Sequence, residues 1–87
     1  MTLSGELTFA SARSVLEGAR PQVADGSGPV EVDLSAVTRV DSAGLALLLE
    51  LAREARENKR ELRCTHAPEQ LRRLAEFFGI TPLLALS

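Results

Sequence analysis

The sequence predicts an α/β domain with a small, mostly parallel sheet and helices packed mainly on one face. Short stretches of alternating apolar residues are separated by stretches with helical spacing, and strands that alternate with helices imply a parallel sheet. The predicted strands also have one polar side, whereas a sheet covered on both faces would show near-continuous apolar runs. With 87 residues, 45% of them apolar, the chain fits a single domain over residues 1–87.

The first strand and the first helix are predicted before the proline at position 21. Apolar and polar residues alternate over residues 1–7, which is typical of a strand. The spacing then becomes helical, with Thr8 as the expected N-cap, and Pro21 should end the helix near Arg20. The apolar stripe of this helix consists of Phe9, Ala12, Val15, Leu16 and Ala19.

The second strand follows the clearest loop signal of the chain, the glycine-rich segment 25–29. Residues 30–34 alternate strictly and predict a strand, and residues 35–41 should connect that strand to the next helix. This second helix is predicted from Ser42, acting as its N-cap, to Asn58.

The last part of the chain predicts one further strand and one further helix. Residues 61–65 alternate again, Pro68 suits the first turn of a helix, and Gly79 suits the position just after its end. Residues 81–86 are apolar and predict a final turn docked on the core. The stripe of the third helix consists of Leu71, Leu74, Ala75 and Phe78.

Charge and composition exclude several classes of function. The net charge is −2, and glutamates interrupt the densest basic stretch, so no large positive field for nucleic acid is expected. Cys64 and His66 alone cannot make a zinc site, which needs about four ligands. No signal peptide and no apolar run long enough for a bilayer are found, so we expect a cytoplasmic protein without direct membrane insertion, metal or cofactor.

The second helix carries the most unusual pattern. Its apolar arc is about 200° wide, whereas a surface helix needs a stripe of roughly 100°. Either the small domain buries this helix deeply, or Leu47 and Leu51 flank a patch that faces a partner.

The turn Asp41–Gly44 begins this helix and is the predicted functional element. Ser42 should be exposed there, and Asp41 adds negative charge near the positive end of the helix dipole. Ala43 and Gly44 are small, so a partner could approach the backbone closely. A phosphate on Ser42 would be held by the helix N-terminus yet repelled by Asp41.

These residues resemble a known family. Val-Asp-Leu-Ser at 32–35, followed by Asp-Ser-Ala-Gly-Leu at 41–45, is similar to the core signature of STAS domains. Leu-Ser-Gly-Glu-Leu at 3–7 and the segment 71–80 extend the resemblance over almost the whole chain. STAS domains usually have another strand before the one at 3–7, so either the sheet is one strand smaller or the true start lies upstream.

Within that family the chain most resembles the STAS subunit of Mla-type phospholipid ABC transporters (MlaB-like). The run 39–49 and the ending 78–84 are similar to that branch. The resemblance implies a non-catalytic subunit that binds the cytoplasmic ATPase of a complex with permease and lipid-binding subunits. That complex maintains outer-membrane lipid asymmetry, and the domain would lie at the inner face of the inner membrane. The implied partner-binding residues are Thr38, Arg39, Asp41, Ser42, Ala43, Gly44 and Leu47.

The alternative branch is the anti-sigma factor antagonists, in which a serine at the Ser42 position is phosphorylated by a partner kinase. Ala46 stands where that branch more often has glycine. An enzyme is not predicted. Asp41, Ser42 and His66 lack the Gly-x-Ser-x-Gly elbow of a hydrolase, and no Walker-type phosphate loop is found.

Overall fold

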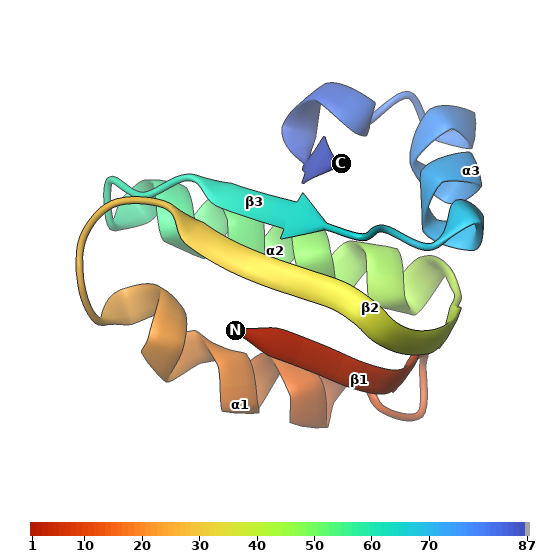
Figure 1. Cartoon of the computed structure of the whole chain (residues 1–87), viewed down its shortest axis with the longest axis horizontal. Coiled ribbons are helices and arrows are strands. Elements are labelled where there is room, and N and C mark those ends of the chain that lie inside the picture. The colour runs from red at the N-terminus through yellow and green to blue at the C-terminus, as the bar shows by residue number, and fades with distance from the viewer. Residues whose placement is uncertain (87) are drawn as a thin grey trace.

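The computed structural model describes residues 1–86 as one parallel sheet with helices (Figure 1). Strands β1 (Thr2–Leu7), β2 (Val30–Val40), β3 (Leu62–Thr65) and β4 (Ala85–Leu86) lie in the sheet in chain order, each parallel to its neighbours. Three α-helices connect them: α1 (Ala12–Ala24), α2 (Ser42–Glu57) and α3 (Glu69–Phe77). The predicted α/β class is confirmed.

The helices cover one face of the sheet, as predicted. Figure 1 shows α1 and α2 side by side behind the strands, and the two helices contact each other. The strand side chains that point toward them are buried, whereas the opposite face of the sheet is polar. The buried residues are Leu3, Leu7, Val30, Val32, Leu34, Leu62 and Cys64; exposed residues on the other face include Thr2, Ser4, Glu31, Ser35 and Arg63.

Strand β2 is longer than predicted. Alternation stops at Leu34, but β2 continues to Val40 because β1 pairs with it along residues 33–40. The register between these two strands shifts on either side of Ser4–Gly5, and Gly5 has φ +74°. A bulge of this kind breaks the alternation that marks a strand in sequence. The segment 35–40, predicted as a connection, is therefore strand that leads directly into the turn at Asp41.

Both predicted ends of α1 are wrong. The helix begins after Ser11 rather than Thr8, and it passes through Pro21 to Ala24. A proline costs a helix one hydrogen bond, and here the helix continues for one more turn, in which Val23 is buried. The guanidinium of Arg60 supports this turn by donating to the carbonyl oxygens of Gln22 and Val23 at 2.9 and 3.0 Å.

Helix α2 is buried deeply, which decides between the two interpretations of its wide apolar arc. Leu47 is 4% exposed and Leu51 is fully buried, so they do not form a surface patch. The buried residues of α2 are Gly44, Leu45, Leu47, Leu48, Leu51 and Ala55.

The C-terminal segment adds a short strand that was not predicted. The expected final turn is the 3₁₀ turn Thr81–Leu83, after which β4 pairs with Arg63 and Cys64 of β3. In α3, Leu71 and Ala75 are buried as predicted, but Phe78 is 53% exposed. Within residues 1–86 no helix has both the length and the apolar character needed to span a membrane.

Candidate functional site

The predicted functional turn lies at the carboxyl end of the sheet. The β1–α1 loop and the β2–α2 turn meet at this end, on the right in Figure 1. The backbone N–H of Asp41 donates to the carbonyl oxygen of Leu7 at 3.2 Å, so the two segments are in direct contact. Loops beyond the carboxyl ends of parallel strands are a frequent place for binding sites.

Asp41, not Ser42, is the N-cap of α2. Its Oδ1 accepts hydrogen bonds from the backbone N–H groups of Ala43 at 2.9 Å and Gly44 at 3.1 Å. The prediction that Ser42 caps the helix is therefore wrong. Asp and Ser are about equally good caps, so the sequence allowed either residue. The length of β2 explains why Asp41 is the cap. The strand continues to Val40 and leaves Asp41 in extended conformation just before the helix.

The second carboxylate oxygen of Asp41 joins the neighbouring loop to the turn. Oδ2 accepts from the backbone N–H of Phe9 at 3.1 Å. This hydrogen bond, with those from Gly44 and Ala43, holds the pKa of Asp41 below its usual value. One ionised carboxylate thus fixes the start of α2 and the start of the β1–α1 loop together.

Acidification is expected to destabilise the domain through Asp41. Its folded-state pKa is lowered, so its stabilising contribution is complete above the unfolded-state pKa of about 4 and is lost as the pH falls through the folded value. In Asp41→Asn an NH2 group would replace one carboxylate oxygen, and this group cannot accept a hydrogen bond from a backbone N–H. The variant should therefore melt at a lower temperature than wild type near neutral pH. The difference in melting temperature should shrink below about pH 4.

Thermal unfolding followed by circular dichroism across this pH range measures the effect. Asp25→Asn, in the exposed 25–29 loop, is the control and should follow wild type at each pH. An Asp41→Asn variant whose melting temperature stays parallel to that of wild type down to the acid limit would contradict the role of the charge.

Gly44 must be small because of the way the core is packed. It is buried, and a Cβ at this position would lie 1.9 Å from the carbonyl oxygen of Leu7 and 2.9 Å from the Leu7 Cβ. The first turn of α2 therefore packs directly on the end of β1. The sequence-based interpretation of Gly44 as an open approach to the backbone is not supported by this packing.

The other predicted site residues separate into a surface group and a buried one. Ser42 is exposed, and none of the hydrogen bonds formed among residues 1–86 involves its hydroxyl. Thr38 and Arg39 are exposed near the end of β2, and Ala43 is half-buried. Leu47 and Gly44 are buried in the core.

Phe9 is the surface residue of this site that the sequence interpretation missed. Its spacing in the sequence predicts a place in the core stripe of α1, but Phe9 precedes the helix and its side chain is 88% exposed. The sequence signal that could have placed it is Ser11, a residue type that favours the N-cap position and would start the helix at Ala12.

Asp41, Ser42 and His66 do not form a hydrolase triad among the described residues, because His66 and Asp41 have different partners. His66 Nδ1 lies 3.2 Å from Oδ1 of Asp33, while the carboxylate of Asp41 accepts only from backbone N–H groups among residues 1–86. Neither group is hydrogen-bonded to Ser42 within this described part of the chain.

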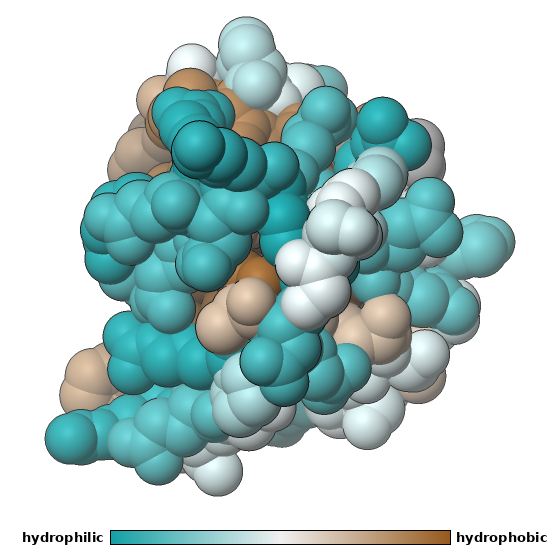
Figure 2. Space-filling model, turned by 90° about the vertical axis from the view of Figure 1, so that its left-hand side faces the viewer, coloured by the Kyte–Doolittle hydropathy of each residue, from teal (hydrophilic) through white to brown (hydrophobic). Residues whose placement is uncertain are grey.

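The opposite end of the molecule differs in character. Figure 2 views this end, formed by the 25–29 loop and the α2–β3 connection, and shows that hydrophilic residues cover most of it. Exposed residues there include Asp25, Ser27, Asn58, Lys59 and Glu61.

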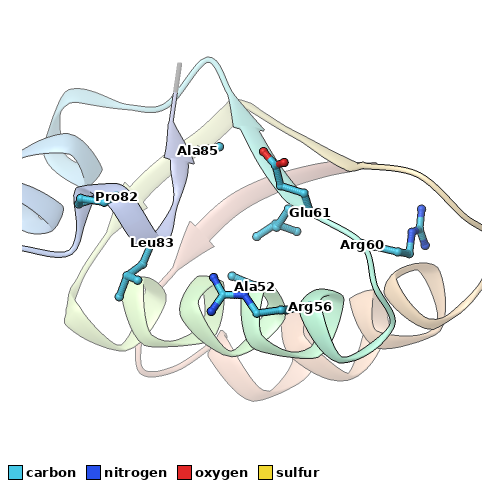
Figure 3. A pocket seen from close by; sticks show the side chains of 8 residues that line it. Ala52, Arg56, Arg60, Glu61, Pro82, Leu83 and Ala85 are labelled. Atoms are coloured by element: carbon cyan, nitrogen blue, oxygen red, sulfur yellow. The ribbon is translucent and has the colours of Figure 1, made fainter.

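A cavity of about 360 Å³ lies between α2, the start of β3 and the 3₁₀ turn (Figure 3). It exists because two-residue β4 pairs only with Arg63 and Cys64, which leaves the edge of β3 open at Leu62. Two of its charged groups already have partners, since Arg60 donates to carbonyl oxygens and Glu61 accepts from Arg63. In Figure 3 the Arg60 side chain is directed away from the other lining residues.

Known proteins resemble this chain in sequence. The family model described as Mlab, STAS domain, matches residues 1–85. The intermembrane phospholipid transport system binding protein MlaB of Haemophilus influenzae is 38% identical over 56 residues, which are 64% of this chain and 53% of that protein. The chain thus spans about half the length of the curated relative it matches.

Proposed function

The chain belongs to the STAS domain family, and from this membership we propose that it is a non-catalytic subunit of an Mla-type phospholipid ABC transporter. It binds the cytoplasmic ATPase subunit of that complex and supports its activity, in a system with permease and lipid-binding subunits that maintains outer-membrane lipid asymmetry. The protein would then act in the cytoplasm, at the inner face of the inner membrane, without inserting into the bilayer.

The observation that supports this proposal is the rigid, exposed turn at the start of α2. Asp41 accepts from the N–H groups of Ala43 and Gly44 in the first turn of the helix, and Ser42 is exposed at the surface. Thr38 and Arg39 are exposed on the strand that leads into this turn. A surface that is already ordered loses little conformational entropy on binding, which favours docking to a folded partner.

The similarity to the Haemophilus protein supports the choice of partner. Its name assigns it to an intermembrane phospholipid transport system. The pattern of small residues and leucines at 43–49 that carries the resemblance is used mainly inside the fold, since Gly44, Leu45, Leu47 and Leu48 are buried. The proposed contact therefore rests on the exposed residues beside that pattern.

Stimulation of a partner ATPase is the expected activity. The purified chain alone should hydrolyse no ATP, because no Walker-type phosphate loop is found in its sequence. Added to the purified ATPase subunit of the transporter, or to the complex assembled without it, the chain should co-purify and raise the rate of ATP hydrolysis. Steady turnover by the chain alone, or an unchanged rate together with no co-purification, would refute the proposal.

The second candidate function is an anti-sigma factor antagonist controlled by phosphorylation of Ser42. One observation favours it, namely that the Ser42 hydroxyl is exposed and does not cap the helix. The N–H groups of Ala43 and Gly44 already donate to Asp41, so a phosphate on Ser42 would meet a carboxylate instead of free donors. Incubation with a serine-kinase anti-sigma factor and ATP, followed by mass spectrometry, tests it through the mass of the peptide that contains Ser42.

A further inference from the structure

We propose that Phe9 is the aromatic anchor of the partner interface and inserts its ring into an apolar pocket of the partner. A carboxylate of the partner beside that pocket would pair with Arg39. This inference rests on the proposed function, because it assigns the surface through which the ATPase subunit is bound. The occupant is therefore a folded protein surface with an apolar pocket and an acidic rim.

The exposure of Phe9 is the first observation. Its side chain is 88% exposed, although an aromatic ring contributes roughly 150–250 Å² of area when it is buried. Phe77 and Phe78 are also exposed, at 82% and 53%, but they pack against each other edge to face with ring centroids 5.1 Å apart. Within residues 1–86 no ring contact of this kind involves Phe9.

The backbone around Phe9 is held by several hydrogen bonds. Thr8 is only 6% exposed, its N–H donates to Ser11 Oγ at 3.0 Å, and its carbonyl oxygen accepts from the N–H of Ala12 at 2.8 Å. The hydroxyl of Ser11 donates in turn to the carbonyl oxygen of Glu6 at 2.6 Å. Aromatic residues, phenylalanine included, are enriched in protein interfaces, and a backbone that is already ordered lowers the entropy cost of binding.

The loop that carries Phe9 lies next to the turn that carries Ser42. The N–H of Phe9 is bonded to the carboxylate of Asp41, the residue that immediately precedes Ser42, so the backbone that carries the ring adjoins the turn that carries the hydroxyl. The carboxylate of Asp41 accepts hydrogen bonds from the backbone of both segments, at Phe9 and at Ala43 and Gly44. A partner that covers Ser42 therefore meets the β1–α1 loop as well.

The exposed charge of Arg39 indicates an acidic border around the partner's apolar pocket. Arg39 is exposed, and within the described residues its guanidinium forms no ion pair, although its charge contributes to the lowered pKa of Asp41. The carboxylate of Asp41 is already occupied by backbone N–H groups. The guanidinium is thus available for an acidic side chain of the partner, and a bidentate contact to a carboxylate would fix its orientation.

Binding of the purified full chain to the purified ATPase subunit, measured by calorimetry, tests the inference. Phe9→Ala should weaken binding by at least about 30-fold, since truncation of a central aromatic anchor has effects of this size. Its melting temperature should remain near that of wild type, because the ring lies in solvent. Phe77→Ala removes an equally exposed ring elsewhere and should change the dissociation constant by less than about threefold.

Arg39→Glu tests the rim, with Arg13→Glu as its control. Both residues are exposed, but Arg13 is paired with Glu17 at 3.3 Å on α1. Arg39→Glu should weaken binding by more than about tenfold, and Arg13→Glu should change it by less than about threefold.

The outcomes separate this inference from the proposed function. If Ser42→Arg abolishes binding while Phe9→Ala binds like wild type, the Phe9 anchor is refuted and the proposed partner stands. If Phe9→Ala and Phe77→Ala weaken binding equally, the effect is not specific and the anchor is again refuted. If the wild-type chain does not bind the ATPase subunit, the proposed function and this inference fall together.

Discussion

Gly44→Ala is expected to remove most of the stability of the domain. The added methyl group would lie 1.9 Å from the carbonyl oxygen of Leu7, 2.7 Å from its carbonyl carbon and 2.9 Å from its Cβ. The first two of these atoms belong to the backbone of β1, so relief requires α2 to move away from the sheet. Overpacking of a core costs about 1–3 kcal/mol, and more where the backbone must shift. The total free energy of unfolding of a small domain is only about 5 kcal/mol.

Chemical denaturation followed by circular dichroism measures this loss. Gly18→Ala is a matched control, because Gly18 lies in α1 and an added Cβ would meet nothing within 4 Å. Replacement of a helical glycine by alanine at such a site should stabilise the domain by up to about 1 kcal/mol. Equal midpoints for Gly44→Ala and wild type would show that the contact between α2 and β1 is looser than described.

Ser42→Arg is expected to reduce binding to the ATPase subunit by orders of magnitude while the domain stays folded. The side chain at this position points into solvent in the isolated chain, so the larger residue fits without disturbing the core. At a closely packed interface the same side chain adds bulk and a charge that must be buried without a partner, at a cost of several kcal/mol. The dissociation constant, measured together with the melting temperature, reports both effects.

Two smaller substitutions serve as controls for the same position. Ser42→Thr keeps the hydroxyl and should bind within about tenfold of wild type. Ser42→Ala should have almost unchanged stability, because Asp41 and not Ser42 caps the helix. A loss of about 1 kcal/mol in Ser42→Ala would instead indicate that the serine acts as a cap in solution. Unimpaired binding by folded Ser42→Arg would remove this turn from the interface.

Patterns of apolar residues predicted the parts of the fold that they determine directly. The alternation in 30–34 and 61–65, and the helical spacing after Ser42, are set by which side chains point to the core. The one-sided sheet followed from the polar partners in the same strands. The wide arc of α2 also indicated its burial, although only the structure decides that Leu47 and Leu51 are inside.

Features that depend on contacts between distant segments were not predictable in this way. The extension of β2 to Val40 depends on pairing with β1 and on a change of register, and β4 exists only through two residue pairs with β3. The cap was ambiguous between Asp41 and Ser42, which differ by one position and are both good caps. Phe9 has the spacing of a core residue, but it precedes the helix in a loop that is bonded to Asp41, and its side chain is exposed.

The irregular pairing of β1 with β2 near Gly5 also bears on how copies of the domain meet one another. Within residues 1–86, β1 forms one edge of the sheet, and an exposed flat edge is a template for pairing with another chain and for aggregation. The irregular register around Gly5 and the exposed charge of Glu6 interrupt that edge, and β4 at the other edge offers only two residues. Within the described residues, both edges of the sheet are therefore poorly suited to strand addition.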